Sequence, residues 1–195
     1  IYFTTGVTLT DAHAVAFSTG AAVIGTITFA STLDGTTDFT EDVTFTAGTG
    51  SILFTGAVGF TTDLNDILIV SAADVTFSST LNANSLVQQA GTGDTQFDGA
   101  VLLEALAGTG MDVTTNTVTI NSTIDTATAA NGGTVTITNA GLLDIAVGAD
   151  MNLDGAFLQD GAGVVQTAGD ITTTGDDIYF TTGVTLTDAH AVAFS

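Results

Sequence analysis

The sequence predicts an all-β chain wound as a parallel β-solenoid, or β-helix, of tandem repeats. Three observations lead to this prediction: the chain repeats itself, its short apolar runs alternate with Thr, and clusters of Gly, Asn and Asp separate those runs. Periods of about 20 to 50 residues are typical of solenoids and arrays, and period-2 alternation is typical of strands with one buried face. The alternative is a row of tandem β-sandwich domains, which would need about 100 residues each.

The longest repeat joins the two ends of the chain. Ile1–Ser18 returns letter for letter as Ile178–Ser195. We therefore expect residues 1–177 to be one full tandem repeat and residues 178–195 to begin the next identical repeat. On this interpretation the sequence is a window from a longer array, and both chain ends are arbitrary.

A shorter repeat divides the long one into four sub-units of about 44 residues. The segment ITFASTLD, which starts at Ile27, is similar to segments that start at Val75 and Val118. The AGTG segments at Ala47 and Ala90 have the same separation as Val75 and Val118. Two coils of about 22 residues per unit predict about eight coils per repeat and an axial rise of roughly 38 Å.

The expected strands follow the runs of Thr, Val, Ile and Phe in chain order. They cover residues 26–29, 43–46, 67–70, 75–77, 113–120 and 135–138. Turns are expected at the AGTG, NGG and TGDD clusters between these runs. Only Val101–Ala107 is expected to form a helical turn instead. The four sub-units and these strands together specify a column of stacked short strands.

The charge of the chain excludes several functions. It has 21 acidic residues and no Lys or Arg, and the formal net charge is −21. Nucleic acids and anionic membranes are both bound through basic side chains, so we expect neither partner. The apolar runs are far shorter than the roughly 18 residues of a spanning helix, so no membrane insertion is expected. No disulfide or thiolate chemistry is available without cysteine.

We also expect no enzymatic activity and no required cofactor. Paired carboxylates can act as general acid and base in glycoside hydrolysis. The best pair, Asp176 and Asp177, is adjacent in sequence and would point to opposite faces of a strand. Acidic side chains are therefore better candidates for binding a cation than for catalysis.

The first candidate metal site is the segment Asp150–Gly155, whose sequence is DMNLDG. Asp150, Asn152 and Asp154 reproduce the first half of a calcium loop, in which alternate oxygen side chains and a sixth-position Gly wrap a hard cation. The twelfth position is Gly161, where a bidentate Glu is expected. The alternative is that strand alternation alone turns these three side chains to solvent and the two apolar residues between them to the core.

The second candidate site is the acidic segment that contains Asp34, Asp38 and Asp42, together with Glu41. It lies where the first step of the short repeat is longer than the second, and extra loops on solenoids commonly form interaction surfaces. The alternative is a solvated turn whose Asp side chains bond the backbone. A weaker metal candidate pairs an Asp with a His two positions later: Asp11 with His13, and Asp188 with His190.

Several stretches carry a family resemblance. The VTF-type strands and AGTG turns combine with NGGTVTITNAG at 131–141, DMNLDGAFLQDGAG at 150–163 and TAGDITTTGDD at 167–177. In this combination the chain resembles the very large β-strand-repeat surface proteins of bacteria, akin to filamentous-haemagglutinin-type adhesins. The resemblance implies an exported, fibrous cell-surface or extracellular protein with a β-helical fold. It transfers no catalytic residues.

We therefore expect a structural extracellular filament or fibrous surface protein that self-associates into fibres, with Ca²⁺ as the candidate cation for bundling them. Two alternatives stay open. One is an adhesin stalk that binds glycans or cell surfaces, and the other is a polymer of separate subunits joined by strand exchange.

Overall fold

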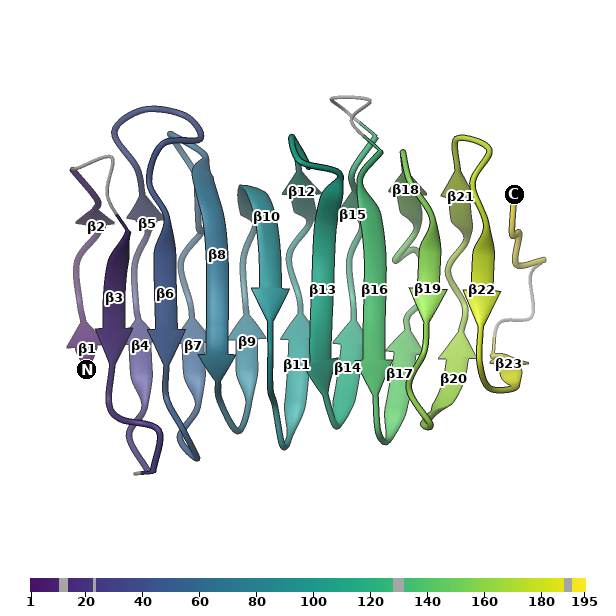
Figure 1. Ribbon diagram of the computed structural model, residues 1–195, viewed down its shortest axis with the longest axis horizontal. Coiled ribbons are helices and arrows are strands. Elements are labelled where there is room, and N and C mark those ends of the chain that lie inside the picture. Colours follow the sequence, from purple (N-terminus) through teal and green to yellow (C-terminus); the bar gives the residue numbers. More distant parts are fainter. Residues whose placement is uncertain (11–13, 23, 128–131, 188–190) are drawn as a thin grey trace.

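The chain folds as a parallel β-solenoid (Figure 1). The computed structural model describes residues 1–10, 14–22, 24–127, 132–187 and 191–195. Within these residues every regular element is a strand, and all pairings between the named strands are parallel. No helix among them is long and apolar enough to cross a membrane. The predicted all-β solenoid is confirmed, and the uninterrupted sheets leave no place for separate sandwich domains.

Each coil carries strands on up to three faces, which we call the first, second and third face. The first face is one continuous sheet of nine strands and therefore marks eight coils. In chain order its strands are β1 (Tyr2–Phe3), β4 (Ile27–Phe29), β7 (Ile52–Phe54), β9 (Val75–Phe77), β11 (Asp94–Phe97), β14 (Thr117–Ile120), β17 (Leu142–Ile145), β20 (Val164–Thr167) and β23 (Val184–Leu186).

The second and third faces complete the coil. The second face contains β2 (Val7–Thr8), β5 (Leu33–Asp34), β12 (Val101–Leu103), β15 (Ile124–Asp125), β18 (Met151–Leu153) and β21 (Ile171–Thr173). The third face contains β3 (Val15–Ser18), β6 (Val43–Thr46), β8 (Leu64–Ser71), β13 (Thr109–Thr115), β16 (Thr134–Asn139), β19 (Phe157–Gln159) and β22 (Ile178–Phe180). β10 (Leu81–Gln88) runs through the corner and pairs with β12 at its start and β13 at its end. In Figure 1 the third-face strands run opposite to those of the other two faces.

The short sequence repeat corresponds to two coils. Ile27 pairs with Ile52 and then with Val75 on the first face, and Val118 follows two coils later through Thr95. The coil from Ile27 to Ile52 is longer than the coil from Val75 to Thr95. The additional residues form the loop between β5 and β6, at the corner where β10 runs on as one strand.

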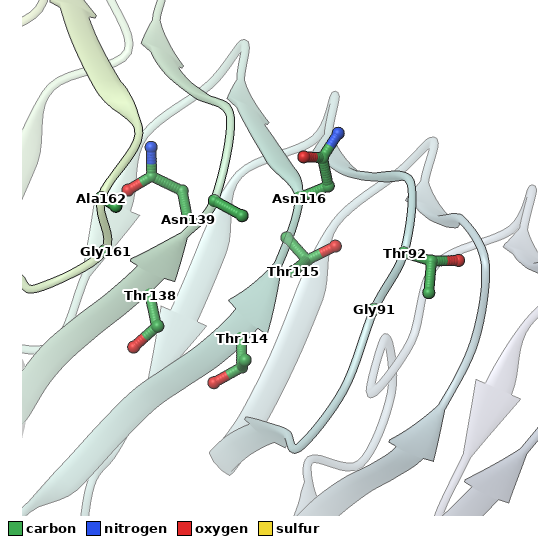
Figure 2. Close-up of a pocket in the computed structure, with 10 residues that line it drawn as sticks. Gly91, Thr92, Thr114, Thr115, Asn116, Thr138, Asn139, Gly161 and Ala162 are labelled. Atoms are coloured by element: carbon green, nitrogen blue, oxygen red, sulfur yellow. The ribbon is translucent and has the colours of Figure 1, made fainter.

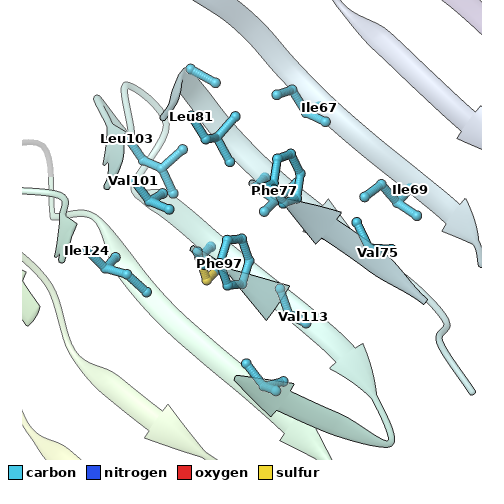
Figure 3. Packing of buried hydrophobic residues seen from close by; sticks show 14 of the residues in the cluster. Ile67, Ile69, Val75, Phe77, Leu81, Phe97, Val101, Leu103, Val113 and Ile124 are labelled. Atoms are coloured by element: carbon cyan, nitrogen blue, oxygen red, sulfur yellow. The ribbon is translucent and has the colours of Figure 1, made fainter. Parts of the chain in front are cut away.

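The core is a continuous column of apolar side chains (Figure 3). Alternation turns every second residue of a strand inward, so equivalent inward positions stack from coil to coil. On the first face this produces a stack of five rings, with centroids 4.7 to 5.4 Å apart: Phe3, Phe29, Phe54, Phe77 and Phe97. Ile120 and Ile145 continue the same row. The Thr, Val and Phe runs therefore fold as strands because one of their two faces is buried in this column.

Two predicted elements are corrected. Val101–Ala107 is no helical turn: β12 covers its first three residues, and a turn that includes Ala105, with φ of 50°, follows. Val101 and Leu103 are fully buried while Leu102 lies outward, which is the period of a strand. The predicted strand over residues 113–120 is interrupted at the exposed Asn116, where the chain turns from the third face to the first.

Candidate functional site

The carboxylates of the acidic segment accept hydrogen bonds from the next coil. Asp34, Asp38 and Asp42 lie in or beside the loop between β5 and β6, at the top of Figure 1. The backbone N–H of Thr61 donates to Asp34 at 2.9 Å, and that of Asp63 donates to Asp38 at 3.1 Å. Asp42 accepts from the Asn65 side chain at 2.7 Å and from the Asp66 N–H at 3.3 Å. These side chains join two coils in a chain that has no Lys or Arg to pair with them.

Glu41 is a deeply enclosed carboxylate, with only 1% of its surface exposed. The Thr36 hydroxyl donates to its Oε1 at 2.6 Å, while its Oε2 has no hydrogen-bond partner. Burial alone would raise the pKa of Glu41, but the Thr36 hydroxyl and the nearby polar groups of Thr40 and of the backbone at Thr36 and Thr37 outweigh it and lower the pKa. Gly35 leaves room for Oε2, because a Cβ there would lie 2.5 Å from it. Glu41 is therefore held as a buried anion.

The DMNLDG segment is a strand rather than a wrapped loop. Met151 and Leu153 are buried in the core, while Asn152 between them is exposed. Asp150 accepts a hydrogen bond from the Asp170 N–H at 2.9 Å, one coil further along. Asp154 accepts from the Gly132 N–H and, at 3.0 Å, from the Thr174 hydroxyl. The three predicted ligands thus follow strand alternation, and two of them bond neighbouring coils.

The six predicted metal ligands form two separate groups along the solenoid. β5, which contains Asp34, and β18, which begins after Asp150, are five coils apart along the second face. No group of three or more His, Asp or Glu side chains within the described residues lies close enough together to hold one metal ion. The calcium sites therefore stay a prediction. The Asp–His pairs of the terminal repeat (Asp11 with His13, Asp188 with His190) fall outside the described residues.

Like charges also stack along the solenoid. Burial, followed by the charge of Asp38, raises the pKa of Asp63 in the next coil. Burial and the nearby carboxylate of Asp160 likewise raise the pKa of Asp112 on the outer side of the third face. Sequence reasoning missed these pairs, although the separation of Asp38 and Asp63 by about one coil was a usable signal. Such pairs repel each other and would be relieved by a cation.

A groove lies at the corner where the third face turns into the first (Figure 2). It has a volume of about 450 Å³ and crosses four successive coils. Small polar and apolar residues line it, including Thr92, Thr114, Asn116, Thr138 and Ala162. The groove exists because these corners are built from small side chains stacked in register. The sequence contained no motif that marked it.

The comparisons with known proteins add no identity to this geometry. No protein family, curated protein or solved structure matches the chain significantly. The fold is that of β-helix repeat proteins.

Proposed function

We propose that this chain is a structural segment of an extracellular filament or fibrous cell-surface protein, built from tandem β-solenoid repeats. The observation that carries the proposal is the continuous core and the unbroken first-face sheet that run through all eight coils. Solenoid stability comes from each coil packing on its neighbours, so such a column can be extended by further repeats. The likeness to filamentous-haemagglutinin-type surface proteins in strand and turn motifs supports the same role.

Apolar side chains at both ends of the column support self-association. Phe3 and Phe17 in the first coil and Phe180 in the last are only partly buried against the core. Strand edges and apolar surface at the end of a solenoid are suited to pairing with another strand. A further repeat, or a second copy of the chain, would cover them.

The charge pattern supports a role for divalent cations between fibres. With a formal charge of −21 and no Lys or Arg, two fibres repel each other in the absence of counterions. Ca²⁺ takes carboxylate, carbonyl and water oxygens in flexible geometry, so it can bridge carboxylates on different surfaces. The loop between β5 and β6 and the β18 region supply the candidate carboxylates.

Glycan or surface binding by an adhesin stalk is the second candidate function. The groove of about 450 Å³ supports it, because Thr114, Asn116 and Thr138 offer hydroxyl and amide groups that can bond sugar hydroxyls. A glycan array probed with the chain tests this role directly. Binding that disappears in Asn116→Ala would favour the stalk over a purely structural fibre.

Fibre diffraction from the assembled protein tests the structural proposal. We expect a meridional reflection at ~4.8 Å and an axial rise of roughly 38 Å per tandem repeat. Light scattering should rise when Ca²⁺ is added and fall when a chelator removes it. Substituting Asp34, Asp38 and Asp42 together by Asn should weaken this response to Ca²⁺. Substituting Asp150 and Asp154 by Asn shows how much of the response the second candidate group contributes. If neither Ca²⁺ nor chelator changes the light scattering, the proposal of cation bridges between fibres is contradicted, while the proposal of a filament stands.

A further inference from the structure

The two copies of the repeated terminal segment lie on different faces of the solenoid. Tyr2–Phe3 forms β1 on the first face, whereas the identical Tyr179–Phe180 lies in β22 on the third face. Val7–Thr8 forms β2 on the second face, and its copy lies in β23 on the first. Both strands of the second copy thus lie one face earlier than those of the first, and Phe194, the copy of Phe17 in β3, makes an isolated bridge to Ile171 on the second face.

One ring contact within the segment is the same in both places. Phe3 and Phe17 contact each other edge-to-face with ring centroids 5.5 Å apart. Their copies, Phe180 and Phe194, also make an edge-to-face contact with centroids 5.5 Å apart. Both copies therefore bring these two Phe rings together, although the copies lie on different faces of the solenoid.

Both copies are paired to the same body of the protein. Tyr2 pairs with Thr28 of β4, and Tyr179 pairs with Leu158 of β19. Between β1 and β22 the chain completes seven coils and two of the three strands of the eighth. The stretch of chain from Tyr2 to its copy Tyr179 is therefore not a whole number of coils.

The shift leaves the core intact because alternation is the same on all three faces. Phe3 and Val7 turn toward the core in the first copy, and Phe180 and Val184 do so in the second. The in-and-out pattern of a strand has a period of two whichever face it joins. A shift by a whole strand therefore preserves burial, whereas a slip by one residue would turn the apolar side chains outward.

We propose that successive repeats dock one strand out of phase. The next repeat, which begins with β22 and β23, continues the solenoid rotated by one strand position relative to the repeat that begins with β1. This inference rests on the proposed tandem array. It implies that the loop between β5 and β6 faces a different side in each of three successive repeats. The same orientation recurs after three repeats, which is about 110 Å at a rise of ~4.8 Å per coil. One fibre would then present the same carboxylates to neighbours on all sides.

Disulfide trapping in the present chain tests the phase. The chain contains no cysteine, so introduced pairs report without background. Gln166 and Thr185 are partners on adjacent first-face strands and lie outward. Adjacent strands are about 4.8 Å apart, within the Cα range of a disulfide. Gln166→Cys with Thr185→Cys should therefore crosslink almost completely under mild oxidation, as measured by loss of free thiols.

A matched pair reports the opposite arrangement. If the second copy were in phase with the first, Tyr179 rather than Thr185 would lie beside Gln166, as Tyr2 lies beside Thr28. Gln166→Cys with Tyr179→Cys should therefore stay reduced. Its crosslinking would overturn the proposal.

A third pair separates this inference from the fold. Thr119 and Asp144 are outward partners within the solenoid body, so their Cys variants should crosslink in either phase. If this body pair closes but the Gln166–Thr185 pair does not, the phase shift is refuted while the filament proposal stands. If the body pair also stays reduced, the solenoid and the proposed function are both refuted.

Discussion

Removing one ring from the first-face stack should weaken the whole column. Phe54 is 1% exposed, stacks on Phe29 and Phe77 at 5.4 and 4.7 Å, and contacts Phe45 edge-to-face at 5.3 Å. Truncating a buried Phe to Ala costs about 3 to 5 kcal/mol, and each aromatic pair adds about 0.5 to 1.5 kcal/mol beyond burial. With three ring partners lost, Phe54→Ala should lower the free energy of unfolding by an amount at the upper end of that range, about 5 kcal/mol.

Urea unfolding followed by far-ultraviolet circular dichroism measures this loss. Phe60→Ala is the matched control, because Phe60 is 67% exposed and should change the free energy of unfolding by less than about 0.5 kcal/mol. Phe54→Leu keeps an apolar side chain and leaves a smaller cavity, so it should cost less than Phe54→Ala. Equal losses in Phe54→Ala and Phe60→Ala would refute a core organised around the ring stack.

Three further predictions concern charge and close packing. The pKa of Glu41 is lower in the folded protein than its ordinary value of 4.5, so the ionised carboxylate stabilises the fold above that value. This stabilisation is lost as the pH falls through the lower pKa of the folded state. In chemical denaturation, the free energy of unfolding of Glu41→Gln should therefore fall less at acid pH than that of the unsubstituted protein. An identical dependence of the free energy of unfolding on pH would contradict this. The pKa of Asp112 is raised instead, so its ionised form destabilises the fold. Asp112→Asn should therefore increase the free energy of unfolding by less than about 1 kcal/mol at neutral pH and leave it unchanged below the ordinary pKa of 3.8. An increase that persists in acid would exclude the charge as its cause. Gly163→Ala should lower the free energy of unfolding, measured by thermal denaturation, by about 1 to 3 kcal/mol, because the new Cβ would clash with the Gly141 carbonyl oxygen. Gly183→Ala, with open space around it, should be neutral or slightly stabilising in the same melts.

The fold could be predicted because its two periods are local properties of the chain. Alternation in runs such as Val43–Thr46 specifies one buried face, and the matches at Ile27, Val75 and Val118 specify two coils per unit. The error at Val101–Ala107 arose because Leu and Ala favour helices locally, while pairing of β12 with β10 and β15 decided in favour of a strand.

The candidate site was predictable only in part. The sequence located the acidic loop around Asp38 and the alternation of Asn152 with its buried neighbours. It did not reveal that Asp38 bonds the Asp63 N–H or that Glu41 is enclosed, because both depend on which residues lie one coil away. Coil length varies along the chain, since the coil from Tyr2 to Thr28 is longer than the coil from Val165 to Val184. Partners in adjacent coils therefore have no constant spacing in sequence.

The sequence by itself determined an all-β chain, a coil of about 22 residues, an apolar inner row and a surface without Lys or Arg. Tertiary structure alone decided which carboxylates meet across coils and which face each copy of the repeated terminal segment joins. The reason is that alternation distinguishes the inside of a strand from its outside but not one face of the solenoid from another. The face that a strand joins depends on the number of residues in every preceding corner of the solenoid. This sum is a property of the whole folded chain.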